Sequence, residues 1–489
     1  MLFLAVDLGS TNTKASLYDA SLHCLAMRSI PVDYIRADGL VEFNVAQYCN
    51  DMLKLLRSLL DTAAVTPDAR IQITFTGQAE SLLVLDTSGA PLMNAISWMD
   101  ERSTAECTVL DAHFSREQCY ERTGQPATLP TWPATKILWL RSHRPDVFAA
   151  AAHYVLLKDY IVYRLTGRLA ADCSIATFTY YFDIYERRYW PEMLAFLGLR
   201  IDQLPPLEEP CTDAGTLLPE VAAMLGITVC EVTVNRGTLD HFCGMIGTGN
   251  IQPGLLSLST GTVLGLSSMA AEPVRRDTGV PMHYGFLPGT YVLLPTAESG
   301  GVSLEWLKNT CLPNASYTEI DTAAEARKPG DVLFLPYLVG TNAPEFDLDA
   351  CGVFFGLRSR HDAFDLALAV MEGVAHLLKK NCDRIQESGT VIKRIIATGG
   401  GAKSAVWCQL QADITGIPVC IPAEKEAALL GAAMIGAVSV GVFPSLSDAA
   451  AATVRISRTF TPVPSPLYAR KHRQFLALYD SMLSVQRLT

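Results

Sequence analysis

The sequence predicts an α/β protein of two domains, and three observations lead to this prediction. The chain has 489 residues, more than one hydrophobic core usually supports. Short apolar strand patterns alternate with longer helical patterns along its length, which is typical of α/β layers. The N-terminal pattern "LFLAVDLGSTNTKASLY" returns after residue 253 as "GLLSLSTGTVLGLSSM". This repeat of strand, small polar turn and strand indicates two related halves.

The first half opens with three short strand patterns, at 2–7, 13–19 and 24–32, which predict an antiparallel meander. A helix is expected after the cap residue Asn44, with apolar residues at helical spacing up to Leu60. Two further strands are predicted by "IQITFTG" and "LLVLD". Helical spacing returns in "PATKILWLRSH" and "HYVLLKDYIVYRLTG".

The second half repeats the strand–turn–strand pattern and then predicts a long helix, with apolar residues from Leu366 to Ile385 along one face. A strand, "IKRIIATGGG", follows, and another helix opens near Ser404. The change of pattern at 244–254 predicts an N-terminal domain over 1–246 and a C-terminal domain over 247–489.

The composition limits the classes of function. A net charge of −11 argues against broad binding to nucleic acid or anionic membranes, although a local site can still take an anionic substrate. Thirteen cysteines without a C-x-x-C pair indicate buried thiols in a reducing compartment rather than a disulfide framework or zinc site. With no basic leader at the N-terminus, a cytoplasmic location is expected.

An uncharged stretch, "AALLGAAMIGAVSVGVF" at 427–443, needs separate consideration. It is shorter than the ~20 residues of a membrane span and rich in Ala and Gly. The interpretation that we prefer is a small-residue helix that lies close against a sheet.

Glycine and small hydroxyl residues follow an apolar strand in four places: 9–13, 259–262, 300–303 and 399–404. Backbone N–H groups in such turns can bind anions, and glycine lets a phosphate approach the main chain. Each turn alone could be an ordinary loop, but four of them, two in each half, predict a nucleotide site. The chain has neither G-x-x-x-x-G-K-[ST] nor G-x-G-x-x-G.

In the first turn, "AVDLGSTNTK", Lys14 would neutralise phosphate charge while Ser10, Thr11, Asn12 and Thr13 orient phosphate oxygens. Asp7 would hold Mg²⁺ directly or through water, because this ion commonly joins carboxylates to phosphates. The structural alternative is an ion pair between Asp7 and Lys14 that pins the hairpin.

Asp240, in "NRGTLDHFCGMIGTGN", is a second acid at the predicted domain junction. It could accept the proton of a substrate hydroxyl that attacks phosphorus. The alternative is a helix-capping or turn residue. Its neighbour His241 is either a hydrogen-bond donor to substrate or a polar neighbour without function.

These motifs, in this order, resemble the FGGY family of carbohydrate kinases over nearly the whole chain. "DLGSTNTK" is similar to the first phosphate loop, and "TGQAESLLVLDTSGAPLMNAISWMDER" to the sugar-binding stretch. "KILWLRSHRPDVF" and "LLKDYIVYRLTG" resemble the helical region that follows, and "GTLDHFCGMIGTG" the segment with the catalytic acid. "LSTGTV", "GGVSLEWL" and "ATGGGAKSAVWCQLQADITGIPV" resemble the second phosphate turn, a nucleotide-side helix and the adenosine motif.

The resemblance implies two ribonuclease-H-like domains of the actin/hexokinase type around a central cleft, and ATP-dependent phosphorylation of a sugar or polyol with Mg²⁺. By motif position, Asp240 is the implied general base and Asp7 the metal-linked acid. The implied sugar-side residues are Gln78, Glu80, Trp98, Asp240 and His241. The implied nucleotide-side residues are Thr11, Asn12, Lys14, Gly261, Thr262, Gly301, Gly400, Gly401 and Ser404.

The chain departs from the family pattern in two regions. Xylulose-type members often have G-Q-M-H-G where this chain has "GQAES" at 77–81. Two common arginines are missing, in "GTNAP" at 340–344 and "ACG" at 350–352. We expect a small-molecule substrate and no nucleic-acid or membrane partner. Among small molecules, a ketopentose is preferred to a polyol or a sugar acid. For the assembly, a homodimer is one option. For the function, a non-catalytic sensor and an ATPase on the same scaffold remain as alternatives to the kinase.

Overall fold

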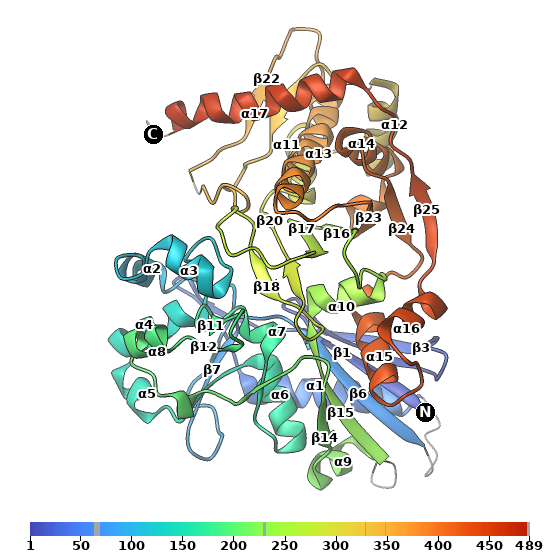
Figure 1. Ribbon diagram of the computed structural model, residues 1–489. Coiled ribbons are helices and arrows are strands. Elements are labelled where there is room, and N and C mark those ends of the chain that lie inside the picture. The colour runs from blue at the N-terminus through green and yellow to red at the C-terminus, as the bar shows by residue number, and fades with distance from the viewer. Residues whose placement is uncertain (63–68, 228–230, 328, 348, 487–489) are drawn as a thin grey trace. The chain divides into compact units, whose positions relative to one another are not determined.

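The computed structural model describes residues 1–62, 69–227, 231–327, 329–347 and 349–486 (Figure 1). The chain packs as two compact units. Unit 1 consists of Met1–Ile251, Met282–Tyr291 and Glu426–Val454; unit 2 consists of Gln252–Pro281, Val292–Lys425 and Arg455–Thr489. The two units therefore do not correspond to a division of the chain at a single residue, because the late segment Glu426–Val454 returns to unit 1.

Unit 1 is built on a six-stranded sheet in which β1 (Leu2–Leu8) is one of the two central strands. The antiparallel meander predicted at the N-terminus is confirmed, since β1 pairs with β2 and β2 with β3 in opposite directions. On its other side β1 pairs in parallel with β6, which pairs in parallel with β15. The strand order is β14 (Asp213–Thr216), β15 (Glu231–Leu239), β6 (Arg70–Gly77), β1, β2 (Asn12–Tyr18) and β3 (Cys24–Pro31).

Helices cover both faces of this sheet, which explains why β1 is apolar at nearly every position. One face packs on α1 (Val45–Leu60), whose predicted cap is confirmed: Asn44 Oδ1 accepts the Gln47 backbone N–H at 2.9 Å. The other face packs on α15 (Ala427–Ser439), which contacts β1, β6 and β15.

The small residues of α15 allow it to approach its neighbours closely. A Cβ on Gly436 would lie 2.6 Å from Thr74 Oγ1 in β6, and one on Gly431 would lie 1.9 Å from the Cys243 carbonyl oxygen in α10 (Asp240–Gly247). The preferred interpretation of 427–443 as a helix against a sheet is therefore confirmed. Among the described helices, none is long and apolar enough to cross a membrane.

A second sheet and several short elements complete unit 1. The five-stranded sheet has the order β4 (Ile35–Ala37), β5 (Leu40–Phe43), β8 (Ala95–Ile96), β7 (Leu82–Leu85) and β9 (His153–Leu156). The helices are α2 (Thr104–Asp111), α3 (Arg116–Thr123), α4 (Pro133–His143), α5 (Pro145–Ala150), α6 (Leu157–Thr166), α7 (Cys173–Ala176), α8 (Pro191–Leu197), a 3₁₀ turn (Ile201–Gln203), α9 (Pro219–Leu225) and α16 (Leu446–Thr453). The remaining strands are β10 (Ala171–Asp172), β11 (Phe182–Asp183), β12 (Arg188–Tyr189), β13 (Leu207–Glu208) and β18 (Met282–Tyr284).

Unit 2 repeats the topology of the first sheet. Here β16 (Leu255–Thr260) pairs antiparallel with β17 (Leu264–Met269) and parallel with β23 (Arg394–Thr398). Next to β23 lie β24 (Val419–Pro422), parallel, and then β25 (Ile456–Phe460), antiparallel. The hairpin β16–β17 with a parallel strand beside it matches β1–β2 with β6, so the prediction of two related halves is confirmed.

The other elements of unit 2 include the predicted long helix, α13 (Ala363–Glu387), which packs against α11, α12 and α14. The remaining described elements of unit 2 are β19 (Tyr291–Leu293), β20 (Thr296–Ala297), α11 (Gly301–Cys311), α12 (Tyr317–Arg327), β21 (Leu333–Leu335), β22 (Val353–Phe355), a 3₁₀ turn (Gly401–Lys403), α14 (Ala405–Thr415) and α17 (Pro466–Gln486). The cysteines within the described ranges are free thiols, and Cys230 lies outside those ranges.

Candidate functional site

Three strands of unit 1 end side by side and place the predicted acids at one edge of the sheet. Leu8, Gly77 and Leu239 are register partners at the carboxyl ends of β1, β6 and β15. Asp240 directly follows this row, and Asp7 directly precedes it. Ligands of open α/β sheets commonly bind at the carboxyl ends of parallel strands. The parallel pairing thus brings together residues that lie more than two hundred positions apart.

Asp7 carries a carboxylate that is short of partners. Its Oδ1 atom is buried and has no hydrogen-bond partner among the residues that the structure describes. Burial and the nearby charge of Asp240 raise the pKa of Asp7 to about 7, and Lys14 opposes this rise. A buried carboxylate oxygen in this state favours binding of a cation.

Lys14 lies opposite Asp7 in the β1–β2 register, but its side chain binds another acid. Its Nζ atom donates to Glu426 Oε2 at 2.8 Å, and both side chains are 33% exposed. Glu426 directly precedes α15, so the segment that returns to unit 1 supplies this partner. The hairpin-pinning alternative is wrong in this respect, because the ion pair of Lys14 is made with Glu426.

The small residues of the first turn differ in how accessible they are. Thr11 is exposed, and its carbonyl oxygen accepts the Val32 N–H at 3.0 Å. Asn12 and Ser10 are half-buried. Thr13 is buried, and its hydroxyl donates to Tyr48 Oη at 3.0 Å. The turn therefore offers Ser10, Thr11 and Asn12 to a ligand, whereas the Thr13 hydroxyl belongs to the core.

Asp240 is the first residue of α10 and accepts the backbone N–H of His241 at 2.6 Å. Burial raises the pKa of Asp240, and the neighbouring His241 partly offsets that rise. A carboxylate with a raised pKa is a stronger proton acceptor than a fully solvated one. The His241 side chain is exposed, beside Asp240.

A β-bulge in β15 sets the position of Asp240. The β15–β6 register shifts between Asn235 and Thr238, and Gly237 has φ +64°. A Cβ on Gly237 would lie 1.7 Å from the Phe75 carbonyl oxygen, so only glycine fits. The fully buried Lys158 donates to the carbonyl oxygen of Arg236 at 2.8 Å and so fixes the bulge.

The predicted sugar-side residue Gln78 is almost fully buried, and both ends of its amide are engaged. Its Nε2 atom donates to the carbonyl oxygens of Leu8 and Gly9 at 3.4 and 3.3 Å, and its Oε1 accepts the Ser81 hydroxyl at 2.6 Å. Gln78 therefore ties the first turn to the loop after β6.

Glu80 and Trp98 lie on loops that Ser81 and Lys136 tie together. The Ser81 Oγ accepts the Trp98 backbone N–H at 3.1 Å, while the Trp98 side chain is 37% exposed. Glu80 has φ +66°, which is uncommon for a residue with a side chain. Lys136 donates to the carbonyl oxygens of Ser97 and Glu80 at 2.8 and 3.3 Å.

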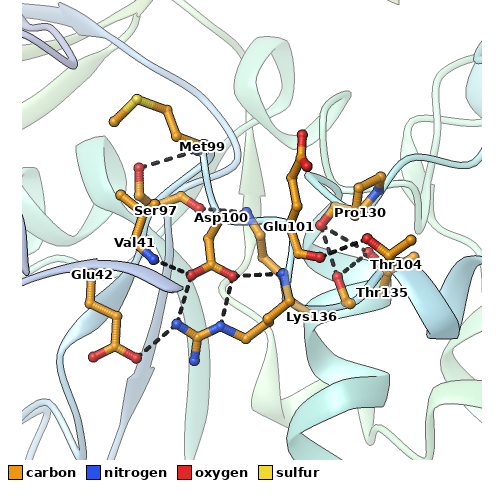
Figure 2. A network of polar contacts seen from close by, with 12 residues as sticks. Val41, Glu42, Ser97, Met99, Asp100, Glu101, Thr104, Pro130, Thr135 and Lys136 are labelled. Atoms are coloured by element: carbon orange, nitrogen blue, oxygen red, sulfur yellow. Dashed lines mark hydrogen bonds and ion pairs between the residues drawn. The ribbon is translucent and has the colours of Figure 1, made fainter. Parts of the chain in front are cut away.

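Next to these loops, Asp100 is at the centre of a buried polar network (Figure 2). Its carboxylate accepts the Val41 N–H at 2.5 Å, the Arg102 backbone N–H at 3.0 Å and two bonds from the Arg102 guanidinium, each at 2.7 Å. Arg102 also binds Glu42 at 2.8 Å. Burial alone would raise the pKa of Asp100, but the bonds from Arg102 and Val41 hold that pKa below its usual value.

In unit 2 the predicted nucleotide-side glycines gather around the end of β16. The Gly301 N–H donates to the Gly261 carbonyl oxygen at 2.7 Å, and the Gly300 N–H donates to that of Thr262 at 3.1 Å. A Cβ on Gly401 would lie 2.7 Å from the Thr260 side chain, whereas one on Gly400 would find its nearest neighbour, the Thr260 carbonyl oxygen, at 3.7 Å.

Three hydroxyls near these glycines have no assigned partner. Thr260 Oγ1, Ser299 Oγ and Ser303 Oγ are buried, and the described part of the chain supplies no hydrogen-bond partner to them. Ser404, in contrast, is engaged: its Oγ caps α14 by accepting the Trp407 N–H at 3.1 Å and donates to Asp321 at 2.7 Å. Free hydroxyls beside glycine turns and the N-terminus of α11 suit a polar, anionic ligand.

Comparison with known proteins identifies the family. Residues 2–247 match the N-terminal domain of the FGGY family of carbohydrate kinases, and residues 254–440 match its C-terminal domain. The chain belongs to the FGGY family of carbohydrate kinases. It is a carbohydrate kinase with the two-domain actin/hexokinase-type fold, as the sequence predicts. The family implies ATP as the phosphoryl donor, typically with Mg²⁺.

Several relatives match the FGGY chain over most of its length. Xylulose kinase of Bacillus subtilis (strain 168) is 29% identical and covers 98% of this chain and 96% of its own. Xylulose kinase of Escherichia coli (strain K12) is 31% identical and covers 85% of each chain. Gluconokinase of Bacillus subtilis (strain 168) is 27% identical and covers 98% of this chain and 95% of its own. The structure of xylulose kinase from Rhodospirillum rubrum is 27% identical, covers 100% of both chains and has a TM-score of 0.93.

Sequence reasoning missed three residues of this FGGY kinase that touch the candidate site: Glu426, Lys136 and Lys158. Glu426 directly precedes the small-residue helix, and the sequence gives no sign of a pairing with Lys14. Lys136 and Lys158 are charged residues inside the apolar patterns "KILWLRSH" and "LLKDYIVY". A lysine on the buried face of a helix is the signal that could have found them, since buried lysines are normally paired.

Proposed function

We propose that this carbohydrate kinase transfers the γ-phosphoryl group of ATP to a hydroxyl of a neutral ketopentose. The observation that carries the proposal is the common sheet edge of Asp7 and Asp240 at the ends of β1 and β15. The relatives named xylulose kinase support a pentulose as the substrate class. We propose the class rather than xylulose itself, because "GQAES" departs from the pattern of xylulose-type members.

The charges around the predicted sugar segment favour a neutral substrate over a sugar acid. Arg102 is the only lysine or arginine within 78–102, and it binds the carboxylates of Asp100 and Glu42. Lys136 is fully buried and donates to two backbone carbonyls. Neither cation is available to a substrate carboxylate, so the sugar-acid alternative, which a relative named gluconokinase supports, takes second place.

In the proposed reaction the sugar hydroxyl oxygen attacks the γ-phosphorus, the bond from phosphorus to the ADP oxygen breaks, and the hydroxyl proton passes to the Asp240 carboxylate. The raised pKa of Asp240 supports this role as general base. The side chains of Glu80, Trp98 and His241 would contact the sugar. Gln78 would act mainly through the turn at Leu8 and Gly9 that it holds.

For the nucleotide, we propose that Thr11, Asn12 and Lys14 bind phosphate oxygens from unit 1. Gly261, Thr262, Gly301, Gly400 and Gly401 would bind the nucleotide from unit 2, and Ser404 would act by capping the helix that follows. In terms of function, 1–246 would be the sugar-binding domain with the catalytic acid and 247–489 the nucleotide-binding domain. Cytoplasmic location, the absence of nucleic-acid partners and a homodimer stay predictions.

The residues present fit one divalent cation bound together with phosphate. Asp7 has a buried oxygen to which the described residues supply no hydrogen-bond partner, and its raised pKa reflects burial near a second acid. In the described ranges no group of three or more His, Cys, Asp or Glu residues could hold a metal by itself. Bound Mg²⁺ would neutralise charge on the phosphates, and Asp7 is the residue that we propose holds it.

The test is ADP formation by the purified protein with MgATP and a panel of D-xylulose, D-ribulose, L-ribulose, xylitol, glycerol and gluconate, against a no-sugar control. We expect a pentulose to raise the rate at least about 100-fold above that control, since sugar-dependent transfer distinguishes a kinase from an ATPase. Gluconate as the best substrate would overturn the neutral-substrate argument. Equal rates with and without every sugar would overturn the proposal as a whole.

A further inference from the structure

Lys136 is the most deeply buried cation next to the predicted sugar-side residues, and the proposed chemistry does not use it. It lies on α4 with no exposed surface. Its Nζ atom donates to the carbonyl oxygen of Ser97 at 2.8 Å and to that of Glu80 at 3.3 Å. Figure 2 shows Lys136 beside Ser97 and Asp100.

The two carbonyls belong to the two loops that carry predicted sugar contacts. Ser97 directly precedes Trp98, and Glu80 is itself a predicted contact. Ser97 follows β8, and Glu80 lies between β6 and β7, the strand that pairs with β8. The ammonium group therefore adds a side-chain link where the two loops already lie side by side. The bridge is therefore one restraint on the separation of Glu80 and Trp98, beside the bond from the Trp98 N–H to Ser81 Oγ.

The backbone at Glu80 requires such support. Its φ of +66° lies in the left-handed region, where a residue with a Cβ is held only if its surroundings enforce that conformation. The bond from Lys136 to the Glu80 carbonyl is one such restraint. Loss of that bond would let the peptide relax and turn the carboxylate away from its present direction.

The charge of Lys136 also interacts with the charge of Glu80. Asp100 is nearby, but its oxygens already accept bonds from Arg102 and Val41. Burial lowers the pKa of Lys136, and the Glu80 carboxylate opposes that shift. Burial likewise raises the pKa of Glu80, and Lys136 opposes it. The two side chains thus stabilise each other's charged forms.

We propose that Lys136 is a positioning residue that fixes Glu80 relative to Trp98 and thereby determines which sugar the site accepts. This inference rests on the proposed sugar-binding role of those two residues. It goes beyond that role because it assigns the selectivity to a residue that has no exposed surface. A positioning residue of this kind acts on sugar binding and leaves nucleotide binding alone.

The test compares Lys136→Met with a matched control, Lys471→Met. Lys471 is also buried, donates to the carbonyl oxygens of Gly330 and Val332 at 2.8 and 3.2 Å and pairs with Glu372, but it lies in unit 2. For Lys136→Met we expect the KM for the best sugar to rise at least about 10-fold, with the KM for ATP within about twofold, since small misplacements of binding groups weaken binding steeply. For Lys471→Met we expect a lower Tm and an unchanged sugar KM.

An unchanged sugar KM in folded Lys136→Met, or an equal loss of sugar and ATP affinity, would overturn the inference. If Lys136→Met does not fold, Lys136→Arg replaces it. Arg keeps the charge, but its larger head still separates the two carbonyls, so its sugar KM must rise too, whereas a lysine needed only for stability would predict no change.

A crystal structure of the folded variant tests the inference independently of activity. We expect Glu80 to leave the left-handed region or the Ser97 carbonyl to move, and an unchanged geometry would overturn the positioning role. If wild type phosphorylates no sugar while this geometry changes as expected, the proposed function fails and the structural part of the inference stands.

Discussion

Lys14 and Glu426 form an ion pair of 2.8 Å although 412 residues separate them in the chain. Lys14 lies on β2, next to the predicted phosphate turn, and Glu426 directly precedes α15. A phosphate that approaches Lys14 must compete with this carboxylate. The segment that returns to unit 1 therefore contributes to the electrostatics of the predicted nucleotide site.

Replacement of the acid in this pair should strengthen nucleotide binding. In Glu426→Gln, Lys14 loses a competing partner and the phosphates lose a repelling charge, so we expect ADP to bind about 2–10-fold more tightly. Because both side chains are 33% exposed, the variant should lose less than about 1 kcal/mol of stability. Isothermal titration calorimetry at low salt measures the affinity.

Lys14→Ala is the control for this prediction. It removes the cation itself and should weaken ADP binding and lower kcat together. If Glu426→Gln weakened binding as much as Lys14→Ala, the acid would serve to position Lys14 for phosphate rather than compete with it.

The raised pKa of Asp7 makes a prediction about stability. Its pKa is about 7 in the folded protein and 3.8 as the ordinary value. The folded state therefore binds the proton more tightly, and the free energy of unfolding falls as pH rises from about 4 to 7. Asp7→Asn removes the ionisable group and therefore removes this pH-dependent decrease in the free energy of unfolding. Without Mg²⁺ and nucleotide, we expect it to be about 1–2 kcal/mol more stable than wild type at pH 8.

At about pH 3 the two proteins should unfold at nearly the same denaturant concentration, because Asp7 is then largely protonated in both the folded and the unfolded state. The same variant should lose at least about 100-fold in kcat with MgATP, since it can no longer hold the cation. Urea titrations at the two pH values measure the first effect. A variant less stable than wild type at pH 8 would show that the charged form of Asp7 is satisfied within the protein.

Substitutions at two adjacent glycines in unit 2 distinguish an effect on packing from an effect on ligand binding. A Cβ on Gly400 meets only the Thr260 carbonyl oxygen within 4 Å, at 3.7 Å, and the residue has helical φ and ψ. Gly400→Ala should therefore fold normally, while its methyl group occupies space that we propose for the nucleotide. We expect the KM for ATP to rise about 10-fold, because phosphates need close approach to the main chain.

Gly401→Ala is the matched comparison. Its Cβ would lie 2.7 Å from the Thr260 side chain, so this variant should lose both thermal stability and nucleotide affinity. Differential scanning fluorimetry with and without ADP measures both quantities. A Gly400→Ala protein with wild-type affinity would place the nucleotide away from this turn.

Much of the site was predictable because local patterns determine it. The hairpin around Asp7 follows from an apolar run, a glycine turn and a second apolar run, and the helix after Asn44 from its cap. Asp240 was predictable as a functional residue from its glycine-rich segment and its resemblance to the family. Its place beside Asp7 depends on parallel pairing of β15 with β6, which follows from the fold type rather than from either motif alone.

The interactions that were not predictable join distant segments. Glu426 meets Lys14 because small residues let α15 pack on the first sheet, and no local pattern determines which acid then faces the hairpin. Lys136 and Lys158 bind carbonyl oxygens at a loop and a bulge, and a sequence does not reveal which backbone groups lack partners. For the same reason the sequence did not predict that Gln78 and Ser404 use their polar atoms within the protein.

The rate of pentulose-dependent ADP formation by Asp240→Asn, compared with wild type, tests the central claim most directly. The substitution keeps the size of the side chain and removes the proton acceptor. We predict that kcat falls about 10²–10⁴-fold while ADP affinity changes less than about twofold, because the base acts only on the sugar hydroxyl. A variant that keeps the wild-type kcat on its best sugar would contradict the claim that Asp240 is the base of this kinase.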